Sequence, residues 1–202
     1  MSAIRLIVGL GNPGTQHEGT RHNAGAFFVR RLAVRYSLTL SADRNALGDS
    51  ARGPVGGHDL RLLVPQTFMN DSGRSVAAMA SYYRVDPNEI LIVHDELDIS
   101  PGEARIKHDG GHGGHNGLRD IIPALGNRKD FWRLRIGIGH PGSARQVSSW
   151  VLSKASAADQ IAIEASIESA ISALPLLLDG DAVKAMTALH SENHQPPTNN
   201  ED

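Results

Sequence analysis

Two separated polar residues, His22 and Asp95, have the side chains that water-activating chemistry requires. His22 stands in "TRHNAG" and Asp95 in "VHDELD", and each is expected to follow a strand and to precede a helix or a turn. From such positions the two side chains can meet above the carboxyl ends of a sheet. An imidazole with an ordinary pKa of about 6.5 accepts a proton from water near neutral pH, and a carboxylate can orient it. For a lone pair of this kind a purely structural contact is the simpler interpretation, and general-base hydrolysis is the other; the pair alone does not decide between them.

The stretch "HDGGHGGHNGLRD", His108–Asp120, is a second candidate site. Its histidines suit either a metal or a proton, and its glycines allow the backbone to approach a bulky substrate closely. His112 and His115 lie three positions apart, and His94 adds a third ligand of the type that a metallohydrolase uses. Glycines do not hold such a pair in place, so a metal site is the alternative interpretation of this loop.

Two other motifs of known enzymes are incomplete or absent in this sequence. "GLGNPG" matches the dinucleotide-binding fingerprint at Gly9, Gly11 and Gly14. However, Pro13 and the polar "TQHEGTRH" delay the next helix to about Asn23, and "VRRLAV" occupies the place of the acidic residue that binds ribose. The nucleophile motif G-x-S-x-G of serine hydrolases occurs nowhere. Water is therefore the expected nucleophile.

Composition limits the classes of protein and partner. The formal net charge is −2, so no global field attracts nucleic acid, and any such binding needs a local patch. Cysteine is absent, which excludes disulfides and thiolate chemistry and fits a reducing compartment. No apolar run approaches the ~18 residues of a membrane span, and no signal peptide is recognised. We therefore expect a cytoplasmic protein without membrane contact.

A local basic patch is available on two predicted strands. Strand alternation places Arg105 with Lys107 on one face, and Arg133 with Arg135 on one face. A solvated sheet face is the simplest interpretation of this pattern, and a surface for nucleic acid is the other.

Hydrophobic periodicity predicts alternating strands and helices. The expected elements are a mid-sheet strand at Ile4–Leu10, a helix from about Asn23, an edge hairpin in 45–65, a helix from about Asn70, a strand at Ile90–Val93 that delivers residues 94–96 into a loop, a helix in 116–126, a strand in 131–138 and two helical segments in 155–190. This order predicts a single α/β domain over residues 1–190, with a mixed twisted sheet and helices on both faces. Residues 191–202 are expected to form a polar, disordered tail.

Five segments together resemble the bacterial-type peptidyl-tRNA hydrolases: "VGLGNPG", "TRHNAG", "PQTFMNDSG", "HDELD…GGHGGHNGLRD" and "RLRIGIGHPG". The similarity runs from Ile4 to His190. It implies an enzyme that hydrolyses the ester between a peptide and the 3′ ribose of its tRNA and so recycles tRNA from aborted translation. It also implies a monomer that uses no metal or cofactor, needs no obligate protein partner and binds the 3′ end and acceptor region of peptidyl-tRNA.

The resemblance also implies roles for individual residues. His22 matches the catalytic base, Asp95 its carboxylate partner, and Asn12 the residue that helps to separate peptidyl-tRNA from aminoacyl-tRNA. The residues that match substrate or tRNA contacts are Phe68, Met69, Asn70, His115, Asn116, Lys107 and Arg135. The last two would grip tRNA phosphates, which revises the solvated-face interpretation. His17 stands where the family usually has an aromatic residue, commonly tyrosine, so this contact with tRNA would have less ring surface.

The site chemistry is consistent with this interpretation. Asn70 and Asn116 offer amide donors and acceptors that can hold a carbonyl group or the attacking water. The glycine loop would bring backbone to the tRNA end and to a peptide of any sequence, so selectivity would rest on the peptide backbone and the ribose. A third hypothesis, besides the hydrolase and the metallohydrolase, is an RNA-binding module without turnover.

Overall fold

A seven-stranded mixed sheet forms the centre of the computed structural model, which describes residues 3–192. Its strand order is β2 (Ser41–Asp43), β3 (Gly48–Val55), β4 (His58–Pro65), β1 (Leu6–Gly9), β5 (Ile90–Glu96), β7 (Trp132–Gly137) and β6 (Ala104–His108). The four central strands are parallel, and β2, β3 and β6 pair antiparallel at the two edges. The predicted α/β fold with a mixed sheet is confirmed.

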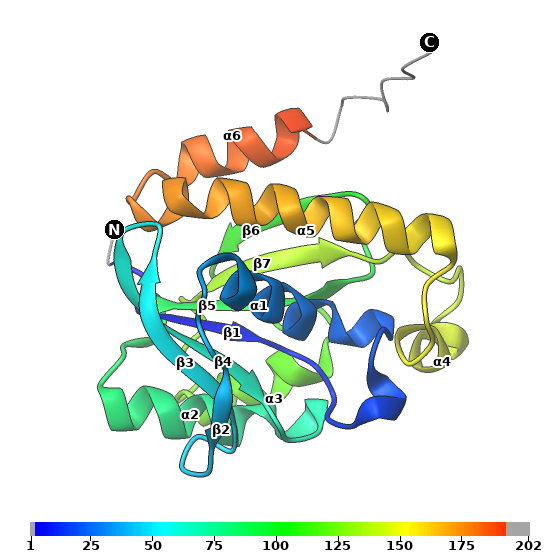
Figure 1. Ribbon diagram of the computed structural model, residues 1–202. Coiled ribbons are helices and arrows are strands. Elements are labelled where there is room, and N and C mark those ends of the chain that lie inside the picture. The colour runs from blue at the N-terminus through cyan, green and yellow to red at the C-terminus, as the bar shows by residue number, and fades with distance from the viewer. Residues whose placement is uncertain (1–2, 193–202) are drawn as a thin grey trace.

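Helices cover both faces of the sheet (Figure 1). One face carries α1 (Ala24–Arg35), α5 (Ala157–Leu178) and α6 (Ala182–Glu192), and the other carries α2 (Ser72–Tyr83) and α3 (Asn116–Ala124). Each set of helices buries its own hydrophobic cluster against the sheet, as a layered α/β domain requires. The short α4 (Val147–Val151) lies at the side of the molecule, beyond the sheet.

Short 3-10 helices connect several of these elements. They are η1 (Thr15–His17), η2 (Arg21–Asn23), η3 (Met69–Asp71), η4 (Pro87–Glu89) and η5 (Ala144–Gln146). Two of them, η2 and η3, directly precede α1 and α2.

Glycines set how closely α1 approaches the sheet. Phe28 and Leu32 of α1 lie four positions apart, are buried and form an apolar stripe on one side of the helix. At the start of the helix, a Cβ on Gly25 would overlap the carbonyl oxygen of Val93 in β5. A Cβ on Gly9 in β1 would likewise overlap the carbonyl oxygen of Gly25. The first turn of α1 therefore packs backbone to backbone on β1 and β5, which fixes the segment before it above the carboxyl ends of these strands.

Helix α5 is more apolar than the prediction of no membrane-span-like run implies. Its length and a mean hydropathy of 1.6 over 18 residues would allow it to cross a membrane, and half of that window is buried in the structure. Ile163, Ile167 and Leu174 of α5 belong to the hydrophobic cluster against the sheet. Its apolar character is explained by its place in the core.

Three boundaries differ from the prediction. Residues 94–96 were expected in a loop, but β5 continues through Glu96 because its backbone pairs with β7 as far as Gly137. The hairpin of β3 and β4 is not itself the sheet edge, since β4 pairs with β1 and the outermost strand is β2. Helix α6 continues through Glu192, past the expected start of the tail at residue 191. The remainder of that predicted tail, residues 193–202, lies outside the described residues.

Candidate active site

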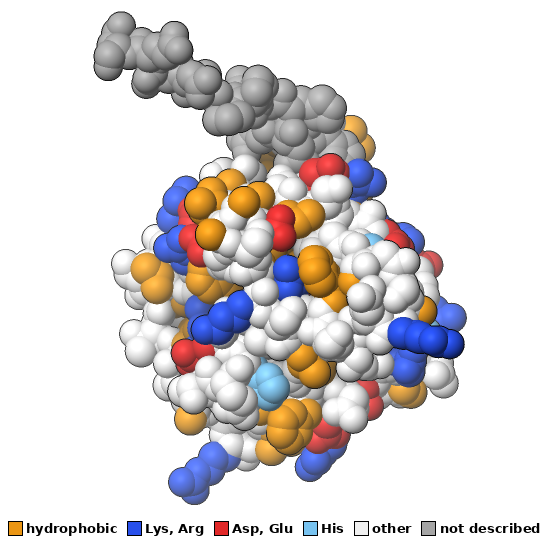
Figure 2. Space-filling view, turned by 90° about the vertical axis from the view of Figure 1, so that its right-hand side faces the viewer, with side chains coloured by type: hydrophobic (Ala, Val, Ile, Leu, Met, Phe, Trp, Pro, Cys, Tyr) orange, Lys and Arg blue, Asp and Glu red, His pale blue; other side chains and the backbone are white. Residues whose placement is uncertain are grey.

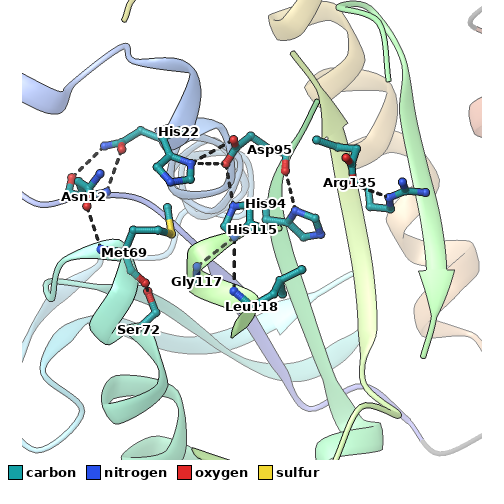
Figure 3. A network of polar contacts seen from close by, with 12 residues as sticks. Asn12, His22, Met69, Ser72, His94, Asp95, His115, Gly117, Leu118 and Arg135 are labelled. Carbon is teal, nitrogen blue, oxygen red and sulfur yellow. Dashed lines mark hydrogen bonds and ion pairs between the residues drawn. The ribbon is translucent and has the colours of Figure 1, made fainter. Parts of the chain in front are cut away.

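His22 and Asp95 meet at the carboxyl end of the parallel strands. His22 belongs to η2, which the packing of α1 holds above the sheet, and Asp95 is near the end of β5. The Nδ1 atom of His22 lies 2.9 and 3.0 Å from the two carboxylate oxygens of Asp95 (Figure 3). The two residues are only 6% and 3% exposed. Because a carboxylate only accepts, Nδ1 of His22 carries the hydrogen and Nε2 keeps its lone pair.

The two groups shift each other's pKa in the direction that a general base needs. Burial lowers the pKa of His22, but the charge and hydrogen bond of Asp95 outweigh it and hold this pKa above its ordinary value of 6.5. Burial alone would raise the pKa of Asp95, yet His22 and His115 hold it well below its ordinary range. Asp95 is therefore ionised at all working pH values, and it stabilises an imidazolium at His22.

His115 is the second partner of Asp95. Its Nε2 lies 3.0 Å from Oδ1 of Asp95, while its Nδ1 accepts hydrogen bonds from the main-chain N–H groups of Gly117 (3.2 Å) and Leu118 (3.4 Å). His115 is the N-cap of α3, so these two N–H groups are ones that the helix cannot satisfy itself. The cap fixes the tautomer, because a nitrogen that accepts from the backbone cannot carry the hydrogen. His115 therefore donates from Nε2 to Oδ1 of Asp95, an oxygen that also accepts from His22.

His94 is buried beside His115 and does not hydrogen-bond to the carboxylate of Asp95. Its ring lies 4.8 Å from that of His115, centroid to centroid, and its Nδ1 donates to the main-chain oxygen of Asp95 at 2.7 Å. Burial, reinforced by His115, lowers the pKa of His94 to about 3. The side chain stays neutral and acts as packing beneath the site.

Asn12 is held in one orientation by contacts at three of its atoms. Its Oδ1 accepts from the main-chain N–H of Met69 at 2.8 Å (Figure 3). Its main-chain N–H donates to Oδ1 of Asn23, and its main-chain oxygen accepts from Nδ2 of Asn23, both at 2.9 Å. With the acceptor of its side chain engaged, Asn12 presents its Nδ2 donor to the cleft that it lines.

A cleft of about 810 Å³ surrounds these residues. Nine of the residues singled out in the sequence line it: Asn12, His17, His22, Phe68, Met69, Asn70, Asp95, His115 and Asn116. Met69 is buried and Phe68 is 60% exposed at the entrance. Gly113 and Gly114, both with positive φ, contribute backbone to the wall, as expected for the glycine loop.

The opposite side of the cleft was not anticipated. We call it the α4 wall, and it consists of Ala144, Val147, Ser148, Val151 and Leu152. Figure 2 looks onto the side of the molecule that carries α4, where hydrophobic side chains gather in several places and Lys and Arg side chains are scattered. The sequence of this segment, "ARQVSSWVL", has weak periodicity and no polar motif, so only the fold brings it to the site.

Asn23 and Arg21 were also missed, although both stand in the quoted motif "TRHNAG". The available signal was their adjacency to His22. Asn23 orients Asn12, as described above, and Arg21 is a buried arginine only 6% exposed.

The predicted basic residues lie outside the cleft lining. In the β6–β7 ladder, Arg105 faces Arg135 and Lys107 faces Arg133, so the four share one face of the sheet. Lys107 is exposed. Arg135 pairs with Glu96 at 3.0 Å, which offsets part of its charge.

The interpretation of a fully solvated face is wrong for Arg133. This residue is 2% exposed, and its guanidinium donates to the main-chain oxygen of Gly110 at 2.6 Å. It therefore secures the start of the glycine loop, and it is not available to phosphates.

The metal set proposed from the sequence does not assemble. His112 is exposed and does not line the cleft, and Nδ1 of His94 is occupied by a main-chain oxygen. Within residues 3–192, the ligand atoms that gather belong to His22, Asp95 and His115, all within 4.8 Å of one another. A metal on Nε2 of His115 would place the ring hydrogen on Nδ1, which accepts from α3. Coordination would therefore remove the cap of the helix.

Comparisons with known proteins agree with the geometry. The family model described as peptidyl-tRNA hydrolase matches residues 6–197. The peptidyl-tRNA hydrolase of Pseudomonas putida is 57% identical over 192 residues, which are 95% of this chain and 99% of the relative. That of Chromohalobacter salexigens is 57% identical over 194 residues, covering 96% and 100%. The crystal structure of peptidyl-tRNA hydrolase from Acinetobacter baumannii matches with a TM-score of 0.91 at 50% identity and covers 98% of both chains. The chain thus belongs to the peptidyl-tRNA hydrolase family.

Proposed function

We propose that this enzyme hydrolyses the ester between the peptide and the 3′ ribose of peptidyl-tRNA, with His22 as the general base. The observation that carries the proposal is the His22–Asp95 contact within a cleft that also presents amide side chains. Nε2 of His22 takes a proton from water, and the oxygen of that water attacks the ester carbonyl. Asp95 stabilises the imidazolium that forms, and the proton passes to the departing ribose oxygen. The products are a free peptide and a tRNA.

Two asparagines are positioned to donate to the developing oxyanion or to the substrate. Oδ1 of Asn12 is engaged by Met69, and Oδ1 of Asn116 accepts from Arg119 at 3.2 Å. In both residues the amide NH₂ is therefore the group available to the cleft. A well-placed oxyanion donor contributes about 10² to 10³ in rate. Asn70, exposed at the entrance, is proposed to contact the tRNA end or the peptide, together with Phe68 and His17.

The direct test of this function is hydrolysis of an N-acylated aminoacyl-tRNA in the presence of a strong chelator. Because the base is activated by Asp95 and coordination would break the α3 cap, chelation is expected to leave the rate undiminished. Release of deacylated tRNA measures the rate. Loss of activity that added Zn²⁺ or Mn²⁺ restores would instead support a metallohydrolase built on His22, Asp95 and His115.

Lys107 is proposed to contact a tRNA phosphate. We expect Lys107→Ala to raise KM and to reduce the slope of log KM against log salt by about one. The same change at Arg135 is expected to have a smaller effect, since Glu96 already shares its charge. Lys184, exposed on α6 and paired with Asp181, is the matched control. An unchanged salt slope for Lys107→Ala would place the tRNA elsewhere.

We further infer that the enzyme acts as a monomer in the cytoplasm. The substrate is found there, and the lack of cysteine suits a reducing compartment.

A further inference from the structure

Arg21, next to the proposed base, is bonded to a segment more than 130 positions away. Its Nη1 donates to Oγ of Ser153 at 2.7 Å and to the main-chain oxygen of Lys154 at 2.9 Å. Its main-chain N–H donates to the main-chain oxygen of Ser153 at 3.1 Å. The guanidinium also stacks on Trp150, with Cζ 3.6 Å from the ring centroid. One side chain thus joins η2 to the residues that directly follow α4.

The α4 wall depends on such contacts for its position. Helix α4 has five residues, which is too short for a helix to be stable without tertiary contacts. Near Arg21, residues 150–154 make two further contacts with the rest of the protein. Nε1 of Trp150 donates to the main-chain oxygen of Gly139 at 2.8 Å, and Thr20 forms a β-bridge with Lys154. Arg21 contacts both Trp150 and Lys154, so it lies at the centre of this attachment.

Burying a guanidinium here is costly, which argues for a geometric role. The nearest carboxylate, that of Asp159, is 3.8 Å away and about one-third exposed, and Nε of Arg21 has no partner within the described residues. An apolar side chain would fill such a site with a smaller desolvation penalty. It would not provide a donor such as Nη1 of Arg21, which reaches both Ser153 and Lys154 from η2.

We propose that Arg21 is a positioning residue that sets the distance between His22 and the α4 wall, and so the width of the cleft that receives the substrate. The inference rests on the proposed function of that cleft. Since Arg21 and His22 are consecutive, the contacts of Arg21 locate the base and the wall relative to each other. Loss of these contacts is expected to affect substrate binding, while the His22–Asp95 pair keeps its own geometry.

The test compares Arg21→Gln and Arg21→Lys with the parent enzyme. For Arg21→Gln we expect KM for N-acylated aminoacyl-tRNA to rise about tenfold or more, as for loss of hydrogen bonds from a charged group. We expect kcat to change less than KM and the acidic midpoint of its pH profile to stay in place. Hydrogen exchange of residues 144–154 should accelerate in the free enzyme. Arg21→Lys keeps the positive charge and a donor that can reach one of the acceptors at Ser153 and Lys154. Its KM should therefore rise less than that of Arg21→Gln.

A milder variant, Ser153→Ala, removes one acceptor and keeps Arg21. It is expected to raise KM in the same direction but by less, and in combination with Arg21→Gln its effect should not add, because both changes break one contact. The matched control is Arg31→Gln, which removes a half-exposed arginine that pairs with Glu164 and Glu168 away from the cleft. This control should leave KM and the exchange of 144–154 unchanged.

Two results would overturn the inference. If folded Arg21→Gln keeps both the KM and the exchange rates of the parent, the α4 wall does not depend on Arg21. If kcat falls and its pH midpoint moves while KM stays constant, Arg21 acts on His22 rather than on the wall. The exchange measurement needs no substrate, so an absence of hydrolysis in the parent would contradict the proposed function without deciding the role of Arg21.

Discussion

His22→Ala is expected to lower kcat by about 10² to 10⁴ while the affinity for peptidyl-tRNA stays nearly unchanged. The variant removes the nitrogen that accepts the proton from water, but it leaves Asn12, Asn70, Asn116 and the basic strands in place. Single-turnover hydrolysis and equilibrium binding of the same N-acylated aminoacyl-tRNA measure the two quantities separately.

The control for this substitution is His58→Ala, in which a histidine at the β3–β4 turn, paired with Asp179, is removed far from the cleft. It should retain the parent rate. Normal turnover by His22→Ala would eliminate the general-base mechanism. Retained binding in a parent protein that never turns over would instead favour the RNA-binding module without catalysis.

Asp95→Asn is expected to lower kcat by about 10³ to 10⁴, as for a carboxylate that orients a catalytic imidazole. The amide that replaces the carboxylate can donate toward Nδ1 of His22, which favours the tautomer with the hydrogen on Nε2 and removes the basic lone pair from the cleft. The loss of negative charge also leaves the imidazolium unstabilised, so both effects act in the same direction.

The pH profile distinguishes this explanation from simple unfolding. In the parent, Asp95 raises the pKa of His22, so kcat should fall as the pH drops through a midpoint above 6.5, where the base becomes protonated. Without that charge the pKa of His22 falls, and the acidic limb of Asp95→Asn should move to lower pH. Asp59→Asn, on the exposed hairpin, provides the charge-matched control. If the pH midpoint of kcat is the same in Asp95→Asn and in the parent, the loss of rate does not come from the effect of Asp95 on the pKa of His22.

The sequence predicted the parts of this protein that depend on local pattern. Helical periodicity predicted a helix from about Asn23, which is α1, and the motifs "TRHNAG" and "VHDELD" pointed to His22 and Asp95. It did not predict features that depend on pairing between distant segments. The extension of β5 through Glu96 requires β7 as a partner, and the burial of Arg133 requires the carbonyl oxygen of Gly110.

The same limit explains why the α4 wall and its contacts were missed. Nothing in "SSWVLSK" marks it as part of a site, since the distant residues that it contacts, such as Arg21, cannot be recognised from the segment itself. The double role of His115 is also invisible in the sequence. Its side chain caps α3 and contacts Asp95 of β5, so both roles require the start of α3 to lie beside the end of β5.

The backbone contact at the start of α1 has a consequence for engineering this enzyme. Exchanging a helical glycine for alanine usually stabilises a protein, since alanine favours a helix by about 1 kcal/mol. At Gly25 the opposite is expected, because the added methyl group would overlap the backbone of Val93 and Leu10 and push α1 away from the sheet. His22, three positions before Gly25, would then move away from the carboxylate of Asp95. Thermostabilising libraries should therefore hold this position constant and vary the outward-facing positions of α1, such as Val34, where substitutions cannot alter the seating of the helix.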